Sequence, residues 1–166
     1  MDAIFSRASV RQFKDTPVED EKAEKLMRAA MAAPSAGNQQ PWQFILVTDE
    51  QLRKNLSGIS KYAGPAAEAP LDIVLLADMG GLRFPQLWQQ DMSAAAENIL
   101  LEAVEQGLGG VWMGVAPDKD RMDAISQLFS LPENIYPFAI IAVGYPRTPV
   151  EKRDRFDPSR VHRDSF

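Results

Sequence analysis

The 166-residue sequence contains no cysteine and only one histidine, His162. The missing thiols exclude disulfides, thiolate zinc or iron–sulfur sites and cysteine nucleophiles. A single histidine excludes a multi-histidine metal site. A Ser-His-Asp triad would require the C-terminal segment that carries His162 to fold back onto the rest of the protein. The G-x-S-x-G nucleophile motif is also missing. These absences argue against metalloenzymes and against hydrolases of the common classes.

Long apolar runs and a surplus of basic residues are absent as well. No apolar run approaches the roughly 20 residues of a membrane-spanning helix, and the first residues lack the apolar core of a secretory signal. We therefore expect a cytoplasmic protein without membrane contact. The net charge of −5 argues against a broad nucleic-acid-binding face. An acidic chain that binds a phosphate must gather its cations locally, so the positions of arginine are informative.

Apolar spacing and helix-boundary residues predict interleaved helices and strands. Thr16, Pro17 and Glu19 match a capping box with proline at the first helical position, and this helix is expected to end at Pro34. Gly107 stands where a C-terminal cap belongs. The sequence further predicts strands at 42–49, 71–78, 109–116 and 136–146, and helices at 50–56, 90–107 and 118–131. This order indicates an α/β or α+β protein and leaves the strand order open.

The segment "RASVR" carries two arginines around a serine. If it is extended, alternation places Arg7, Ser9 and Arg11 on one side. Two guanidinium groups with a hydroxyl between them suit a phosphate or another anion. The alternative is a solvated edge with two ordinary surface arginines.

A polar stretch, "PSAGNQQ", separates the first long helix from the next strand. Ser35, Asn38 and Gln40 offer donors and acceptors that suit the edge of a polar heterocycle, and Gly37 allows unusual backbone angles. The alternative is a helix stop followed by a turn.

Two later segments are weaker signals. The glycine-rich stretch 107–114 fits neither the dinucleotide fingerprint nor the phosphate-binding loop, but Gly114 inside a strand indicates close approach of a ligand. The run "KRDR" at 152–155 supplies three cations after the last strand, and a solvated surface run is the alternative. His162 receives no role.

Together and in order, these segments resemble the nitroreductase family of FMN-dependent oxidoreductases. The resemblance rests on "SRASVRQF", "APSAGNQQPWQF", "GLGGVWMGV", and "AIIAVGYP" followed by "KRDRFD". It spans nearly the whole chain and implies one domain, 1–166, of the α+β class. The implied fold is a central, mostly antiparallel sheet flanked by helices. It also implies an intertwined homodimer in which an exchanged C-terminal arm, 147–166, packs on the partner.

The resemblance implies that FMN is the cofactor and assigns residues to it. Arg7, Ser9, Arg153 and Arg155 would bind the phosphate, and Arg11 would lie near the pyrimidine end of the ring. Met113 and Gly114 would line the ring, with backbone contact to its polar edge. Five residues of the other subunit would cover it: Pro34, Ser35, Ala36, Asn38 and Gln40.

The implied activity is electron transfer from NADH or NADPH, through the flavin, to a small electron-poor acceptor such as a nitroaromatic or a quinone. The flavin carries this ping-pong chemistry, so no catalytic side chain is assigned. Specialised flavin chemistry (dehalogenation, dehydrogenation or flavin destruction) and a non-catalytic FMN-binding or sensing role remain alternatives. The linker 79–90 is shorter than in many relatives, so the substrate face is expected to be open or covered by Phe84, Leu87 and Trp88.

Overall fold

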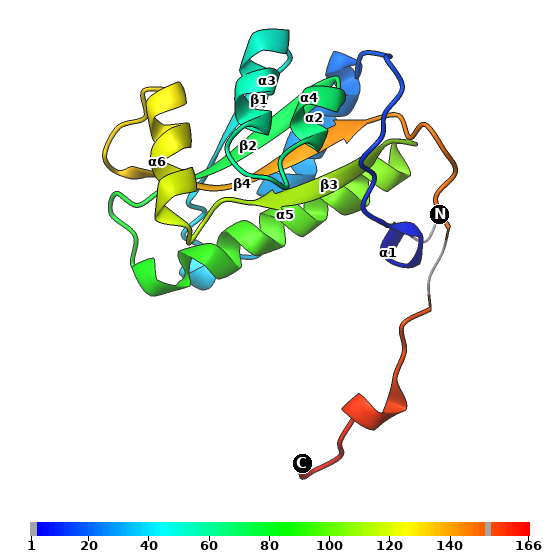
Figure 1. The fold of residues 1–166 in the computed structure, drawn as a ribbon. Coiled ribbons are helices and arrows are strands. Elements are labelled where there is room, and N and C mark those ends of the chain that lie inside the picture. The colour runs from blue at the N-terminus through cyan, green and yellow to red at the C-terminus, as the bar shows by residue number, and fades with distance from the viewer. Residues whose placement is uncertain (1–2, 152–153) are drawn as a thin grey trace.

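The computed structural model describes residues 3–151 and 154–166. Figure 1 shows the helices and strands in their arrangement around one sheet. In chain order they are α1 (Ala3–Ser6), α2 (Asp20–Met31), η1 (Ala36–Asn38), β1 (Trp42–Val47), α3 (Glu50–Ser57), α4 (Pro65–Glu68), β2 (Leu71–Asp78), η2 (Pro85–Leu87), α5 (Trp88–Glu105), β3 (Gly109–Gly114), α6 (Lys119–Leu128), β4 (Ile135–Gly144) and η3 (Pro158–Arg160).

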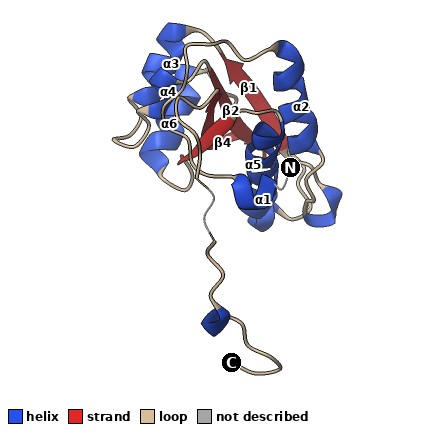
Figure 2. Ribbon diagram, turned by 90° about the vertical axis from the view of Figure 1, so that its right-hand side faces the viewer, coloured by secondary structure: helices blue, strands red, loops and turns tan. Residues whose placement is uncertain are grey.

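The four strands form one antiparallel sheet in the order β1-β2-β4-β3. The central strand β2 is buried from Leu71 to Ala77, as its continuous apolar run predicts. Helices α2 and α5 cover one face of the sheet, and α3, α4 and α6 cover the other (Figure 2). The predicted class, α+β with a central antiparallel sheet flanked by helices, is confirmed.

Side-chain alternation along β2 divides the core between the two faces. Ile73 and Leu75 belong to the cluster with α2 and α5, whereas Val74 and Leu76 belong to the cluster with α3, α4 and α6. No helix among the described residues has the length and apolar character needed to cross a membrane.

Two helix starts and one helix end lie where local sequence predicts them. Asp49 accepts a hydrogen bond from Leu52 N at 2.8 Å, and Asp118 accepts one from Arg121 N at 3.2 Å. Gly107, with φ +72°, follows the end of α5.

The predicted start of the first long helix is wrong. Helix α2 begins at Asp20, four residues after Thr16, and Glu19 is its N-cap without a side-chain capping bond. The Glu19 carboxylate instead accepts from the Tyr145 hydroxyl at 2.7 Å. Because the Glu19 side chain accepts from Tyr145 at the end of the sheet, it is not available for a capping box.

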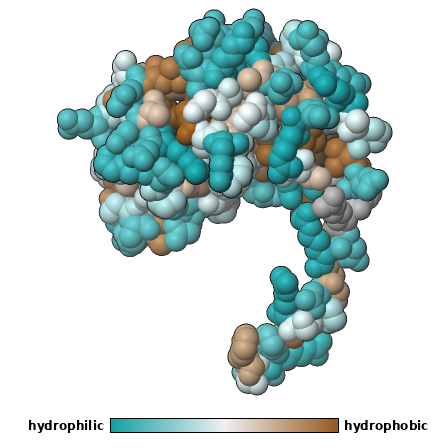
Figure 3. Space-filling view, viewed as in Figure 1, coloured by the Kyte–Doolittle hydropathy of each residue, from teal (hydrophilic) through white to brown (hydrophobic). Residues whose placement is uncertain are grey.

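Beyond the contact of residues 154–156 with the N-terminal segment, the C-terminal residues 157–166 stand clear of the body of the protein (Figures 1 and 3). Phe156 and Val161 are 75% and 59% exposed, and Phe166 is fully exposed. Apolar side chains on an extended arm are typical of a segment that packs on another subunit. The arm's contact with a partner stays a prediction.

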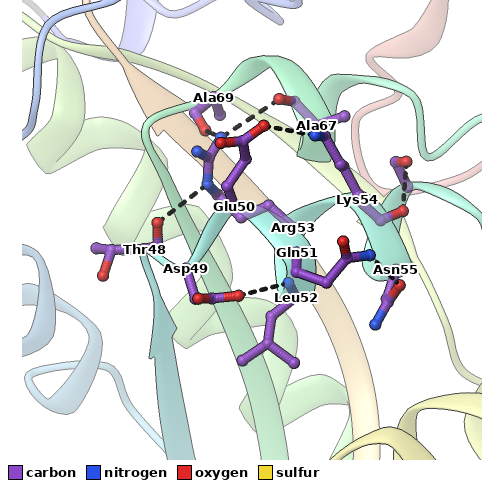
Figure 4. Close-up of polar contacts among 11 residues, drawn as sticks. Thr48, Asp49, Glu50, Gln51, Leu52, Arg53, Lys54, Asn55, Ala67 and Ala69 are labelled. Atoms are coloured by element: carbon purple, nitrogen blue, oxygen red, sulfur yellow. Dashed lines mark hydrogen bonds and ion pairs between the residues drawn. The ribbon is translucent and has the colours of Figure 1, made fainter.

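Asp72 is a buried carboxyl group in the middle of the fold. It is 0% exposed on β2, and neither of its oxygens has a hydrogen-bond partner among the described residues. The positive charge of Arg53 on α3 acts on Asp72, but the Arg53 guanidinium donates to the carbonyls of Thr48, Ala67 and Ala69 (Figure 4). Burial raises the pKa of Asp72 to about 8, and the charge of Arg53 opposes this rise only in part.

The raised pKa of Asp72 predicts a pH-dependent stability. Between pH values of about 4 and 8 the unfolded chain releases this proton and the folded chain retains it, so stability falls as pH rises. Asp72→Asn removes this effect. The free energy of unfolding is measured by urea titration of the variant and of wild type at each pH. We expect the stability advantage of the variant over wild type to increase by up to about 1.4 kcal/mol for each pH unit between pH values of about 4 and 8.

The exposed Asp20→Asn variant serves as the control for the Asp72 experiment, because Asp20 lies on the solvent side of α2. No comparable growth with pH is expected for it. A stability difference between Asp72→Asn and wild type that stays constant from pH 4 to pH 8 would contradict the assigned pKa.

Candidate functional site

Gly109 in β3 allows the N-terminal segment to lie directly on the sheet. A Cβ atom at Gly109 would lie 2.5 Å from Val10 Cγ2, and the Gly110 carbonyl accepts from Val10 N at 3.0 Å. Val10 is therefore buried, whereas Ser9 and Arg11 on either side of it are exposed. The predicted alternation holds for these two residues.

The prediction of an extended backbone is wrong at Arg7. Its N–H donates to Ala3 O at 2.8 Å, which continues the turn of α1. The Arg7 side chain is 21% exposed, and its Nε lies 3.4 Å from Glu97 Oε1 on α5. Arg7 thus reaches the site from a helical turn and is paired with a half-exposed carboxylate.

The two ends of the chain lie side by side at this edge. Lys14 N donates to Tyr145 O at 2.8 Å, and Arg147 N donates to Gln12 O at 3.0 Å. The pairing directs the chain after β4 past the N-terminal segment.

Two adjoining pockets result from this pairing. Arg7 and Arg155 line a pocket of about 310 Å³, together with Glu151 and Asp154. Ser9 and Arg11 line a second pocket of about 370 Å³ against residues 148–151. Four of the five residues predicted for the phosphate and the adjacent ring end are therefore neighbours. The fifth, Arg153, lies outside the described residues.

The polar loop 34–40 is folded by its own hydrogen bonds. Ser35 Oγ accepts from Gln40 N at 3.0 Å, and Gln40 Nε2 donates to Asn38 Oδ1 at 3.1 Å. Pro34, Asn38 and Gln40 are exposed, and Ser35 and Ala36 are half-buried. The loop is thus a turn, as one interpretation of the sequence proposed, and it also presents polar groups outward.

The end of β3 offers backbone rather than side-chain contacts. The Met113 side chain is 5% exposed and belongs to the core, which leaves its backbone for the predicted contact with a ligand; that contact stays a prediction. Gly114 is exposed, and a Cβ atom there would meet nothing within 4 Å. The Gly114 carbonyl accepts from Arg121 Nη1 at 3.1 Å. Open space beside Gly114 leaves room for a ligand.

Three residues that organise the site had no predicted role: Glu97, Asp91 and Gln39. Glu97 pairs with Arg7, and Asp91 accepts from Gln39 and anchors the polar loop to α5. The acidic residues within the largely apolar helix 90–107, Asp91 and Glu97 among them, were the available signal. Among the described residues, no hydrogen bond or ion pair joins the 34–40 loop to the arginine pockets, and no group of three potential metal ligands occurs.

Comparison with known proteins gives a consistent result. The model of the nitroreductase family matches residues 4–87 and 61–145. A provisionally named NADH dehydrogenase/NAD(P)H nitroreductase of Archaeoglobus fulgidus is 43% identical over 98% of this chain and 96% of its own length. A provisionally named NADH oxidase of Clostridium acetobutylicum, solved as a crystal structure, is 50% identical with a TM-score of 0.97, covering 99% of this chain and 100% of its own. An FMN-dependent nitroreductase of Clostridium difficile is 32% identical with a TM-score of 0.92, covering 99% of each chain.

The close contact at Gly109 predicts the effect of one added methyl group. In Gly109→Ala the new Cβ would lie 2.5 Å from Val10 Cγ2 and 3.1 Å from Pro146 Cγ. We expect a loss of about 1–3 kcal/mol in the free energy of unfolding, measured by urea denaturation. Gly64→Ala is the control, because nothing lies within 4 Å of its Cβ position.

A second substitution tests the origin of the loss caused by Gly109→Ala. Val10→Ala makes room for the new methyl group, so Gly109→Ala should cost less in the Val10→Ala background than in wild type. An equal cost in both backgrounds would contradict the contact.

Proposed function

Because the chain belongs to the nitroreductase family, we propose that it binds FMN and transfers electrons from NADH or NADPH to a small electron-poor acceptor. A nitroaromatic or a quinone is the proposed acceptor class, and the kinetics are proposed to be ping-pong. The observation that carries this proposal is the convergence of Arg7 and Arg155, from the two ends of the chain, on one pocket.

The donor set of this edge fits a flavin phosphate. Arg7 and Arg155 supply charge-assisted donors, and Ser9 adds a hydroxyl from the adjoining pocket. Arg153 is proposed to complete the set. Glu97 pairs with Arg7 and is 48% exposed, so a bound dianion can replace it at little desolvation cost. Arg11 is proposed to place its positive charge toward the ring.

A second subunit is proposed to complete each site. The loop residues proposed to cover the flavin are Pro34, Ser35, Ala36, Asn38 and Gln40. Their exposed polar groups and the exposed apolar residues of the arm 154–166 both support a homodimer with exchanged C-terminal segments. The backbone at Met113 and Gly114 is proposed to face the ring. A cytoplasmic location stays a prediction.

The chain's own residues bind and orient, and none is assigned a proton-transfer step. When bound, the flavin supplies the redox chemistry between the nicotinamide and the acceptor. The arginines would hold the phosphate, and the loop would exclude water from one side. Arg11 would place a positive charge near the ring, which favours the reduced flavin.

An absorbance spectrum of the purified protein tests the proposal. We expect a flavin spectrum with about one FMN per chain, and oxidation of NADH or NADPH that depends on an added quinone. Flavin binding without turnover would favour the sensing alternative. A colourless protein that takes up no added FMN would refute the proposal.

Arg7 provides a specific test of the phosphate assignment. Arg7→Ala should raise the dissociation constant for FMN about 10- to 150-fold, the equivalent of about 1.5–3 kcal/mol. Isothermal or fluorescence titration measures this value. Riboflavin, which lacks the phosphate, should bind both proteins with similar affinity.

Glu97→Gln is the matched control for Arg7→Ala, because it removes the same ion pair and keeps the guanidinium. It should bind FMN at least as tightly as wild type. Equal weakening of FMN binding by the two variants would mean that the ion pair, and not a phosphate contact, is responsible.

A further inference from the structure

Gln39 faces inward, whereas its neighbours Asn38 and Gln40 are exposed. Its Nε2 donates to Asp91 Oδ2 at 2.6 Å and to Phe84 O at 3.1 Å. Its Oε1 accepts from Phe84 N at 2.9 Å. Both ends of the amide group are therefore engaged, and its partners determine its orientation.

Asp91 is the buried end of this contact. It is 4% exposed in the first turn of α5, and no ion pair between described residues includes it. Its Oδ1 accepts from Ala36 N at 2.8 Å. A buried carboxylate without a cation depends on such donors and on the helix N-terminus. Both hydrogen bonds come from the polar loop, so Asp91 ties this loop to α5.

The same contacts tie the loop to the linker between β2 and α5. The Gln39 amide group accepts from the N–H of Phe84 and donates to its carbonyl, and the Phe84 ring lies against Gly37. A Cβ atom at Gly37 would be 2.6 Å from Phe84 Cε2. Loop and linker are therefore packed as one unit.

The loop backbone needs such an anchor. Asn38 and Gln40 have φ values of +56° and +48°, and Gly37 has +55°. Residues other than glycine adopt this left-handed conformation rarely, and it persists where surrounding contacts fix it. Gln39, with φ −76°, lies between the two strained residues and makes those contacts.

We propose that Gln39 and Asp91 are positioning residues that fix the flavin-covering loop and the Phe84 ring relative to each other. The inference rests on the proposed function, which assigns the exposed Asn38 and Gln40 to the flavin. Gln39 and Asp91 act through these residues and through Phe84. A change at the contact should therefore alter both flavin binding and the use of the acceptor.

A swap of chemical groups tests this contact. Gln39→Glu places a carboxylate against that of Asp91, and Asp91→Asn places an amide donor against the Gln39 amide donor. The double variant Gln39→Glu/Asp91→Asn restores a donor–acceptor pair, and the amide oxygen introduced by Asp91→Asn can still accept from Ala36 N. Gln51→Glu makes the same chemical change on the exposed face of α3 and is the control.

Three readouts separate positioning from general stability. Each single variant should raise the dissociation constant for FMN at least about tenfold and change the visible circular dichroism of the bound flavin. With FMN saturating, the KM for a water-soluble benzoquinone should rise more than kcat falls. The double variant should recover part of each effect, because the 39/91 hydrogen bond returns while the introduced carboxylate cannot donate to Phe84 O. Gln51→Glu should match wild type.

The inference is overturned if the folded single variants bind FMN with wild-type affinity and spectrum, even where their urea midpoints fall. It is also overturned if the double variant is no better than the worse single variant. If Gln39→Glu does not fold, Gln39→Met, which adds no charge, replaces it. The inference is then tested by the FMN affinity, the flavin circular dichroism and the kinetic constants of that variant. If the wild-type protein does not bind FMN, the proposed function is refuted. If the wild-type protein binds FMN and the variants bind it equally well, only this inference is refuted.

Discussion

The pairing of the N-terminal segment with the end of the sheet is the constraint on which the rest of the site depends. Residues 9–14 run beside β3 and the 145–147 segment, held by backbone hydrogen bonds at both ends of the contact. Glycine is needed at Gly109, where a Cβ atom would lie 2.5 Å from Val10 Cγ2. At Gly144 a Cβ atom would lie 2.6 Å from Pro70 Cδ and 3.0 Å from Phe13 Cδ1. This contact brings arginines from opposite ends of an acidic chain into one region, which neither end could achieve alone.

Two buried aspartates illustrate opposite uses of a carboxyl group. Asp91 accepts from a backbone N–H and from the Gln39 amide, so its burial holds a loop in place. Asp72 accepts from nothing among the described residues, and the nearby Arg53 is already engaged by carbonyl groups. Burial raises the pKa of Asp72, whose oxygens find no donor among the described residues. Asp91 contributes to the architecture of the proposed site, whereas the burial of Asp72 without a hydrogen-bond partner opposes folding.

Local signals in the sequence predicted local structure well and failed where a distant contact intervened. Asp49 and Asp118 cap their helices because the donor lies three residues away. The capping box at Thr16 failed because Glu19 binds Tyr145, far along the chain. The same limit applies to Gln39 and Gln40, which are chemically identical neighbours. Only the fold decides that the first faces Asp91 and the second faces solvent.

The sequence by itself determined the strands of the core and the order of the segments that carry the family resemblance, and that resemblance implied the α+β class. These features follow from periodicity, turn residues and motif order, which are all properties of neighbouring positions. The tertiary structure decided which cations meet, which glutamine anchors the loop, and that the Met113 side chain belongs to the core. Those outcomes depend on contacts between residues far apart in the chain, and such contacts form only when the two faces of the sheet have been packed.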